Sequence, residues 1–218
     1  MLNRVTATFA ELRQQCADFD PQLDEFFDPA QTLAFQSYAP AAATGTLIYI
    51  SPKPGAKPPS AWMPVLDRFK LAWIGAEDSG NEVHVARRVG LALLARQLNP
   101  NKTATSPVLL SGFSGGGRVT SMMLPAYPTL FSGALMICGA NPLFTITEQA
   151  LAQLTSMPMV FLTGTGDFNL EDTQMAIATY QQAGLQRTTL SVVDGLEHAL
   201  PEPGDFAAAL SHLLSVEG

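Results

Sequence analysis

From about residue 45 the chain alternates short apolar runs with longer stretches in which apolar residues recur at helical spacing. Runs rich in Val, Ile, Leu and aromatic residues, with Gly or Pro at their ends, are typical of buried strands. The runs that fit are 45–51, 69–75, 106–113, 132–140, 157–165 and 188–195. The stretches predicted to be helical are 80–98, 115–125, 147–156, 171–183 and 205–216. This alternation predicts an α/β fold with a mostly parallel central sheet flanked by helices.

Two of the predicted helix starts carry the Ser/Thr-x-x-Glu spacing of a capping box. The pairs are Ser79 with Glu82, and Thr145 with Glu148. In such a box the hydroxyl and the carboxylate satisfy backbone N–H groups that the first helical turn leaves without partners. We therefore expect helices to begin close to Ser79 and Thr145.

The chain is expected to form a single domain over residues 1–218, because its length suits one compact unit. Residues 1–44 are less regular and are predicted to be an irregular N-terminal extension of a core over 45–218, with an edge strand at 33–38. The proline-rich stretch 51–64 is predicted to be a loop. Residues 141–157 separate two predicted strands and already contain a helix, which leaves no room for a separate cap domain.

Composition narrows the function classes. Apolar residues make up 47% of the chain and charged residues 14%, which favours a large buried core. The net charge of −7 argues against nucleic acid as the main partner, because phosphate binding needs a basic face. No apolar run reaches the roughly 18 residues of a membrane span. The first 15 residues lack the apolar core of a signal peptide, so a cytoplasmic protein is the default expectation and export the alternative.

The two cysteines do not predict a metal site. Cys16 and Cys138 are far apart, and neither has a metal-type spacing. Cys138 lies in the apolar run "GALMICGA", which favours a buried free thiol over a disulfide. We expect neither a metal nor a cofactor.

The hexapeptide "GFSGGG", residues 112–117, lies between a predicted strand and a predicted helix and fits G-x-S-x-G around Ser114. In a nucleophile elbow the chain turns abruptly from strand to helix, and the serine hydroxyl projects above the sheet edge. A Walker A loop would need Lys followed by Ser or Thr, whereas Arg118 and Val119 follow here. The glycines also lack the G-x-G-x-x-G spacing of a dinucleotide site. The context predicts a nucleophilic Ser114.

A serine nucleophile needs a base, and the chain has three histidines. His84 and His212 fall inside predicted helices, where a structural or solvated role suffices. His198 follows the last predicted strand, in the loop "LEHALP". Because ligands bind at the carboxyl ends of parallel strands, His198 is the expected base.

The base needs an acid that orients it and stabilises its charged form. Asp167 directly follows the predicted strand at 157–165. Asp172 is the nearest rival, but a place in the first turn of a helix behind an Asn169 cap explains it, and a turn explains Asp194. The order Ser114, Asp167, His198 is the chain order expected for a nucleophile elbow, its acid and its base.

These stretches resemble the α/β-hydrolase superfamily, in particular the esterase branch around poly(3-hydroxybutyrate) depolymerases and feruloyl esterases. The matching segments are "LLSGFSGGGRVTSMM", "YPTLFSGALMICGA", "MVFLTGTGDFNLEDT" and "VVDGLEHALPEP". The resemblance runs from about residue 45 to the C-terminus. It implies a serine hydrolase of small carboxylic esters, with Ser114 as nucleophile, Asp167 as acid and His198 as base.

The resemblance also implies an oxyanion hole built from backbone N–H groups. One donor would be Gly115, the residue after the nucleophile. The second would come from the loop after the strand at 45–51, where relatives often have His-Gly and this chain has Ser51-Pro52. Because proline has no N–H, the donor would shift to Lys53 or Ser51. Short-chain or aryl esters are the expected substrates, with a serine peptidase or a silent binding module as the alternatives.

Overall fold

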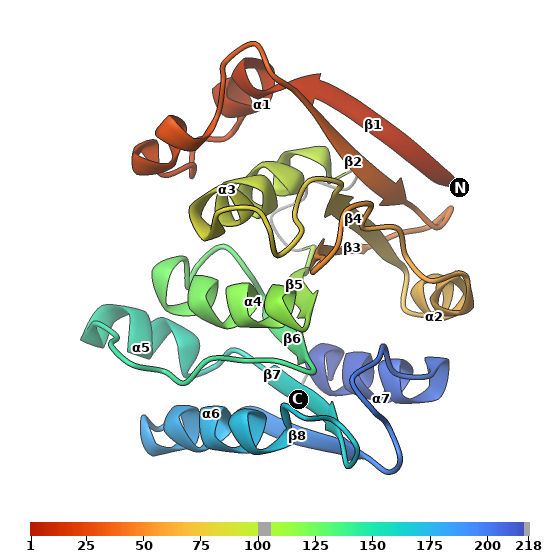
Figure 1. Ribbon diagram of the computed structural model, residues 1–218, viewed down its shortest axis with the longest axis vertical. Coiled ribbons are helices and arrows are strands. Elements are labelled where there is room, and N and C mark those ends of the chain that lie inside the picture. The colour runs from red at the N-terminus through yellow and green to blue at the C-terminus, as the bar shows by residue number, and fades with distance from the viewer. Residues whose placement is uncertain (100–105, 216–218) are drawn as a thin grey trace. The chain divides into compact units, whose positions relative to one another are not determined.

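A computed structural model describes residues 1–99 and 106–215 of the chain (Figure 1). The chain divides into two compact units, Met1–Val108 and Leu109–Gly218. Each unit builds its own set of strands and helices. A single domain over 1–218 stays a prediction.

The first unit is built on strands in the order β1-β2-β4-β3, where β1 and β2 pair antiparallel, β2 and β4 pair antiparallel, and β3 and β4 pair parallel. Helices α3 and α2 pack on opposite sides of these strands (Figure 1). The elements are β1 (Leu2–Thr8), α1 (Phe9–Gln15), a 3₁₀ turn (Pro21–Phe26), β2 (Thr32–Tyr38), β3 (Gly45–Ile50), a 3₁₀ turn (Ser60–Trp62), α2 (Met63–Arg68), β4 (Leu71–Ala76), α3 (Val85–Ala95) and a 3₁₀ turn (Arg96–Leu98).

The N-terminal segment is more regular than its sequence predicts. The strand expected at 33–38 is confirmed as β2, but its edge position is wrong because β1 pairs with it along its whole length. Helix α1 follows β1 and begins at a complete capping box, in which the Glu11 N–H donates to Thr8 Oγ1 and the Thr8 N–H donates to Glu11 Oε2. These two bonds satisfy backbone donors at the helix start.

Both predicted capping boxes are wrong. Helix α3 begins later than expected, at His84, whose Nδ1 accepts from the N–H of Ala86. Ser79 instead joins two loops, since its Oγ donates to the carbonyl of Ala76 and accepts from the N–H of Ser51. Helix α5 is capped by Thr147 rather than Thr145.

The second unit has the predicted alternation of strand and helix. Strands β5, β6, β7 and β8 lie in chain order and pair parallel to one another. The elements are β5 (Val108–Phe113), α4 (Gly115–Ala126), β6 (Gly133–Ile137), α5 (Glu148–Leu154), β7 (Met159–Gly164), α6 (Leu170–Gln182), β8 (Thr188–Val193) and α7 (Pro203–Leu214). All of these strands and helices were expected; residue 216, the predicted end of the last helix, lies outside the described residues.

Burial explains why the strands of the second unit could be found by composition. Every residue of β6 and β7 is buried, because α4 and α6 cover one face of these strands and α7 covers the other (Figure 1). Strands covered on both faces read as continuous apolar runs rather than as alternating ones. Their shared direction places the turns after β5, β6, β7 and β8 at the same edge. None of the helices described is long and apolar enough to cross a membrane.

Candidate active site

The turns at the carboxyl edge of the second unit bring four reactive side chains together. Ser114 follows β5, Cys138 follows β6, Asp167 lies three residues beyond β7, and His198 lies in the loop after β8. The sequence predicted three of these positions and treated Cys138 as a buried thiol. All four come from strand ends, so the parallel sheet itself sets their spacing.

Ser114 has the strained backbone of a strand-to-helix elbow. Its φ of 54° and ψ of −121° lie in a region that non-glycine residues rarely adopt. Two backbone bonds hold it there: the Ser114 N–H donates to the carbonyl of Ile137 at 2.8 Å, and its own carbonyl accepts from the N–H of Arg118 at 3.1 Å. Ser114 is the N-cap position of α4, but its side chain makes no capping bond. The hydroxyl is therefore left for another partner.

Gly112 makes the sharp elbow sterically accessible. A Cβ at this position would overlap the carbonyl group of Gly116 and lie 2.7 Å from the nitrogen of Gly117. The first turn of α4 therefore packs directly on the backbone of β5. Glycine is therefore the residue that fits two positions before the serine.

A hydrogen-bonded chain joins Ser114, His198 and Asp167. The Oγ of Ser114 lies 2.9 Å from Nε2 of His198, and Nδ1 of His198 lies 2.8 Å from Oδ1 of Asp167. An ionised carboxylate can only accept, so Nδ1 carries the imidazole proton. In the neutral imidazole Nε2 is then an acceptor, and the Ser114 hydroxyl donates to it. This is the arrangement that a general base needs.

Asp167 is buried, and its carboxylate is surrounded by donors. The hydroxyl of Thr163 donates to Oδ2 at 2.8 Å, and the N–H of Asn169 donates to Oδ1 at 3.0 Å. Burial raises the pKa of Asp167, but the hydrogen bonds from Asn169, His198, Thr163 and Cys138 outweigh it and leave the pKa below its ordinary value. The carboxylate therefore stays ionised at neutral pH.

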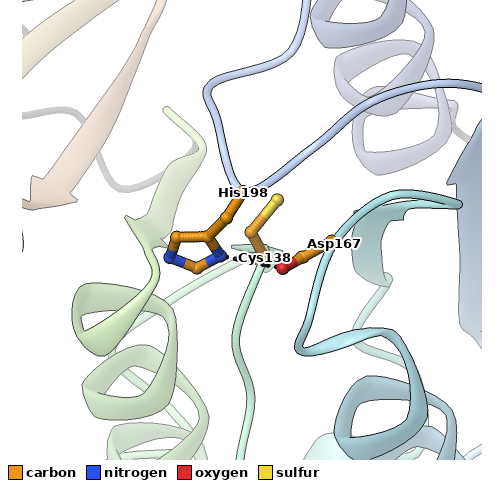
Figure 2. A group of neighbouring side chains, drawn as sticks. All are labelled: Cys138, Asp167 and His198. Atoms are coloured by element: carbon orange, nitrogen blue, oxygen red, sulfur yellow. Dashed lines mark hydrogen bonds and ion pairs between the residues drawn. The ribbon is translucent and has the colours of Figure 1, made fainter.

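Cys138 lies beside this carboxylate (Figure 2) and contributes to its lowered pKa. Its side chain is fully buried, and its Sγ also lies 3.4 Å from the carbonyl of Ala199, beside His198. Burial raises the pKa of the Cys138 thiol, and the adjacent Asp167 charge raises it further, so the sulfur keeps its proton. The backbone of Cys138 has a φ of 51°, which marks a second strained turn at this edge. The expectation of a free buried thiol is confirmed for both cysteines.

The same three side chains are a set that could in principle ligate a metal. Ligand atoms of Cys138, Asp167 and His198 lie within 4.8 Å of one another (Figure 2). Zinc would need the thiolate and a free imidazole nitrogen. Here Nδ1 already donates to Asp167. Their hydrogen bonds account for the closeness of the three side chains.

Arg118 and Asn169 tie the turns together. The Arg118 guanidinium, in the first turn of α4, donates to Oδ1 of Asn169 at 3.1 Å and to Oδ2 of Asp172 at 2.8 Å. Asn169 in turn donates from Nδ2 to the carbonyl of Cys138 at 2.9 Å. Asn169 occupies the N-cap position of α6, as expected, but its side chain makes no capping bond. The network links the turns after β5, β6 and β7.

The two rival acids have other partners. Asp172 lies in the first turn of α6, as expected, and pairs with Arg118. Oδ1 of Asp194 accepts from the hydroxyl of Thr165 at 3.3 Å. Among the carboxylates of the described residues, Asp167 is the one hydrogen-bonded to the ring of His198.

Two aromatic rings contact the imidazole of His198. The centroid of Phe168 lies 4.1 Å from that of the imidazole, with an interplanar angle of 32°, and the centroid of Phe113 lies 5.1 Å away at 34°. Phe113 precedes the serine and Phe168 follows the aspartate in sequence. Phe168 is 76% exposed, although its ring covers part of the histidine.

The other two histidines and the two expected oxyanion donors have the following positions. His84 caps α3 and stacks on Phe26, and His212 lies in the last turn of α7. Gly115 is the first residue of α4, so its N–H has no acceptor within the helix. Lys53 belongs to the first unit, where its N–H donates to Oγ of Ser51 at 3.2 Å. The roles of Gly115 and Lys53 as oxyanion donors stay predictions.

Comparisons with known proteins agree with this architecture at low sequence identity. No family model matches the chain, and no curated protein matches it in sequence. Among solved structures, a ferulic acid esterase is similar with a TM-score of 0.65 and 14% identity over 98% of this chain and 97% of that one. An acyl-protein thioesterase 2 from Zea mays has a TM-score of 0.59 and 12% identity over 83% and 99%. An acylaminoacyl peptidase from Pyrococcus horikoshii has a TM-score of 0.63 and 11% identity over 86% of this chain and 41% of that one.

Proposed function

The chain has the α/β-hydrolase fold, and from that premise we propose that it is a serine hydrolase that cleaves carboxylic esters through Ser114, His198 and Asp167. One observation carries the proposal. The Ser114 hydroxyl, held on a strained elbow, donates to Nε2 of an imidazole whose Nδ1 is fixed by a buried, ionised Asp167. This is the geometry that turns a weakly nucleophilic hydroxyl into an attacking group.

In the first half of the reaction Ser114 Oγ attacks the ester carbonyl carbon, and His198 Nε2 takes the hydroxyl proton. The imidazole then carries a positive charge beside the Asp167 carboxylate, 2.8 Å from Nδ1. Because Asp167 is also bonded to Thr163 and Asn169, its carboxylate is held in position beside the ring. The tetrahedral intermediate collapses when Nε2 returns the proton to the leaving alcohol, and an acyl-enzyme remains on Ser114.

The charge that develops on the carbonyl oxygen needs preorganised donors. The N–H of Gly115, at the positive end of α4, is the proposed first donor. The N–H of Lys53 is the proposed second donor, and it would have to give up its bond to Ser51 Oγ to serve the oxyanion. In the second half of the reaction His198 activates a water molecule by the same proton transfer, and the acid is released from Ser114.

Short-chain or aryl carboxylic esters are the proposed substrates. The fold likeness to a ferulic acid esterase and to an acyl-protein thioesterase supports acyl transfer from oxygen or sulfur esters. The segment between β6 and β7 contains α5 but no separate cap domain, as its length predicted. An uncapped site suits small esters with ready access.

Turnover of p-nitrophenyl acetate and butyrate tests the proposal. The wild type should hydrolyse both, and Ser114→Ala should lower kcat by about 10⁶-fold while leaving the thermal unfolding transition in place. Ser211→Ala is the matched control, because this serine lies on α7 and donates to the carbonyl of Ala207. Folded wild-type protein with no ester turnover would refute the proposal.

A peptidase is the second candidate, supported by the fold likeness to the acylaminoacyl peptidase. That likeness extends over 41% of the peptidase chain. Hydrolysis of the p-nitrophenyl esters without hydrolysis of aminoacyl-p-nitroanilides favours the esterase. The reverse preference favours the peptidase.

A further inference from the structure

Phe168 has an exposed aromatic ring whose position is fixed by hydrogen bonds of the neighbouring backbone and by contact with His198. It lies in the turn between β7 and α6, directly after Asp167. The backbone on both sides is held, because the N–H of Asn169 donates to Asp167 Oδ1 and the N–H of Leu170 donates to the carbonyl of Asp167. The ring therefore stands against His198 with 76% of the residue open to solvent.

A purely structural role does not explain why so much of the Phe168 ring is exposed. A single exposed apolar side chain is common on protein surfaces. This one, however, covers part of the imidazole that also bonds Ser114, and most of its own surface remains uncovered. A phenyl ring in such a place offers a flat apolar surface to whatever approaches the histidine.

The proton transfers made by His198 indicate which part of an ester would lie next to the Phe168 ring. Nε2 lies 2.9 Å from Ser114 Oγ and must later protonate the leaving-group oxygen from about 2.6–3.2 Å. The atoms attached to that oxygen then lie beside the imidazole. The Phe168 ring, whose centroid is 4.1 Å from that of the imidazole, lies beside the same ring that these atoms approach. The acyl group, by contrast, extends from the carbon bound to Ser114.

We propose that Phe168 contacts the alcohol portion of the ester and selects for alcohols that carry an aromatic ring. The inference rests on the proposed ester hydrolysis and adds the substrate class at its leaving-group side. Offset or edge-to-face contact between two rings contributes enough to raise kcat/KM by roughly 2- to 12-fold over an aliphatic ring of the same size.

Benzyl acetate and cyclohexylmethyl acetate test this selectivity. Both are acetates of primary alcohols with a six-membered ring, so the intrinsic reactivity of the ester bond is closely matched and the ratio of their kcat/KM values reports the ring contact. The wild type should prefer benzyl acetate. Phe168→Leu should lower the ratio by about 2- to 12-fold, and Phe168→Tyr, which keeps the ring, should preserve it.

Phe144→Leu is the matched control, because Phe144 is also a strongly exposed phenyl ring and lies in the segment after β6. Its ratio should equal that of the wild type. An unchanged ratio in Phe168→Leu, or an equal change in Phe144→Leu, would overturn the inference while the ester hydrolase assignment stands. Equal losses on both esters in Phe168→Leu would also overturn it, since they would mean that the ring serves His198 alone. Absence of any ester turnover would overturn both proposals together.

Discussion

His198 Nδ1 lies 2.8 Å from Oδ1 of Asp167, whereas Asp172, five residues further on, pairs with Arg118 at 2.8 Å. The two carboxylates therefore have different predicted roles: Asp167 is the acid of the triad, and Asp172 is the ion-pair partner of Arg118. Asp167→Asn should lower kcat by about 10⁴-fold, because an amide at this position favours the wrong imidazole tautomer. Asp172→Asn should cost less than about tenfold, because its ion pair with Arg118 is half exposed.

Esterase kinetics of the two variants, measured side by side, check this prediction. Circular dichroism of each variant controls for folding. A larger loss at Asp172 than at Asp167 would reverse the assignment of the acid.

The pH dependence of stability reports the donors around Asp167. Because these donors hold its pKa below the ordinary value, the carboxylate stabilises the folded state above about pH 4, the pKa of an unfolded aspartate. That contribution is lost as the pH falls through the lowered pKa. The free energy of unfolding of the wild type should therefore fall relative to that of Asp167→Asn as the pH decreases below about 4. Urea titrations across this range measure the difference, and parallel curves for the two proteins would contradict the prediction.

Both cysteines should resist alkylation in the folded protein. Each thiol is buried, and burial raises the pKa of both. The protonated form is a poor nucleophile. Iodoacetamide at neutral pH should add no mass to native protein and should modify Cys16 and Cys138 in urea. Rapid modification of native Cys138, seen by peptide mass spectrometry, would mean that the thiol beside Asp167 is ionised or open.

The elbow should not tolerate a side chain at Gly112. A Cβ there would overlap the backbone of Gly116, so Gly112→Ala should destabilise the fold by at least about 3 kcal/mol. Gly204→Ala, in the first turn of α7, meets nothing within 4 Å and should be neutral or stabilising by up to about 1 kcal/mol. Thermal or urea unfolding of the two variants checks the contrast. Equal changes in the free energy of unfolding would mean that the close packing around Gly112 does not restrict this position to glycine.

The sequence was informative where burial dictates residue type. Strands β3 to β7 could be predicted because fully or largely buried strands need continuous apolar runs. Strand β8 is only partly buried and was predicted from its Val, Leu and Thr residues. Strand β1 was missed because "LNRVTAT" is mostly exposed and lacks a continuous apolar run. Ser114, Asp167 and His198 could be found since each follows a predicted strand, and the parallel sheet brings those ends together.

The residues that support the triad could not be found in this way. Thr163 and Asn169 contact Asp167 because of the way the chain turns after β7. Cys138 approaches Asp167 from the end of β6. Asn169 is a residue type that is common at helix N-caps, so its bond to the Cys138 carbonyl could not be expected from the sequence. Phe168 is an ordinary loop residue until its contact with His198 is known. Ser114 and Cys138 both have a positive φ. The sequence suggests this conformation only for Ser114, because glycines flank it.

Covalent labelling by a fluorophosphonate tests directly whether Ser114 is an activated nucleophile. The reagent reacts with a serine that is activated by a base and needs no knowledge of the natural substrate. Intact-mass and peptide analysis should find one adduct per chain, on Ser114, which is absent in Ser114→Ala and strongly slowed in Asp167→Asn. Folded protein that takes up no label, or takes up the same label after Ser114→Ala, would contradict the account.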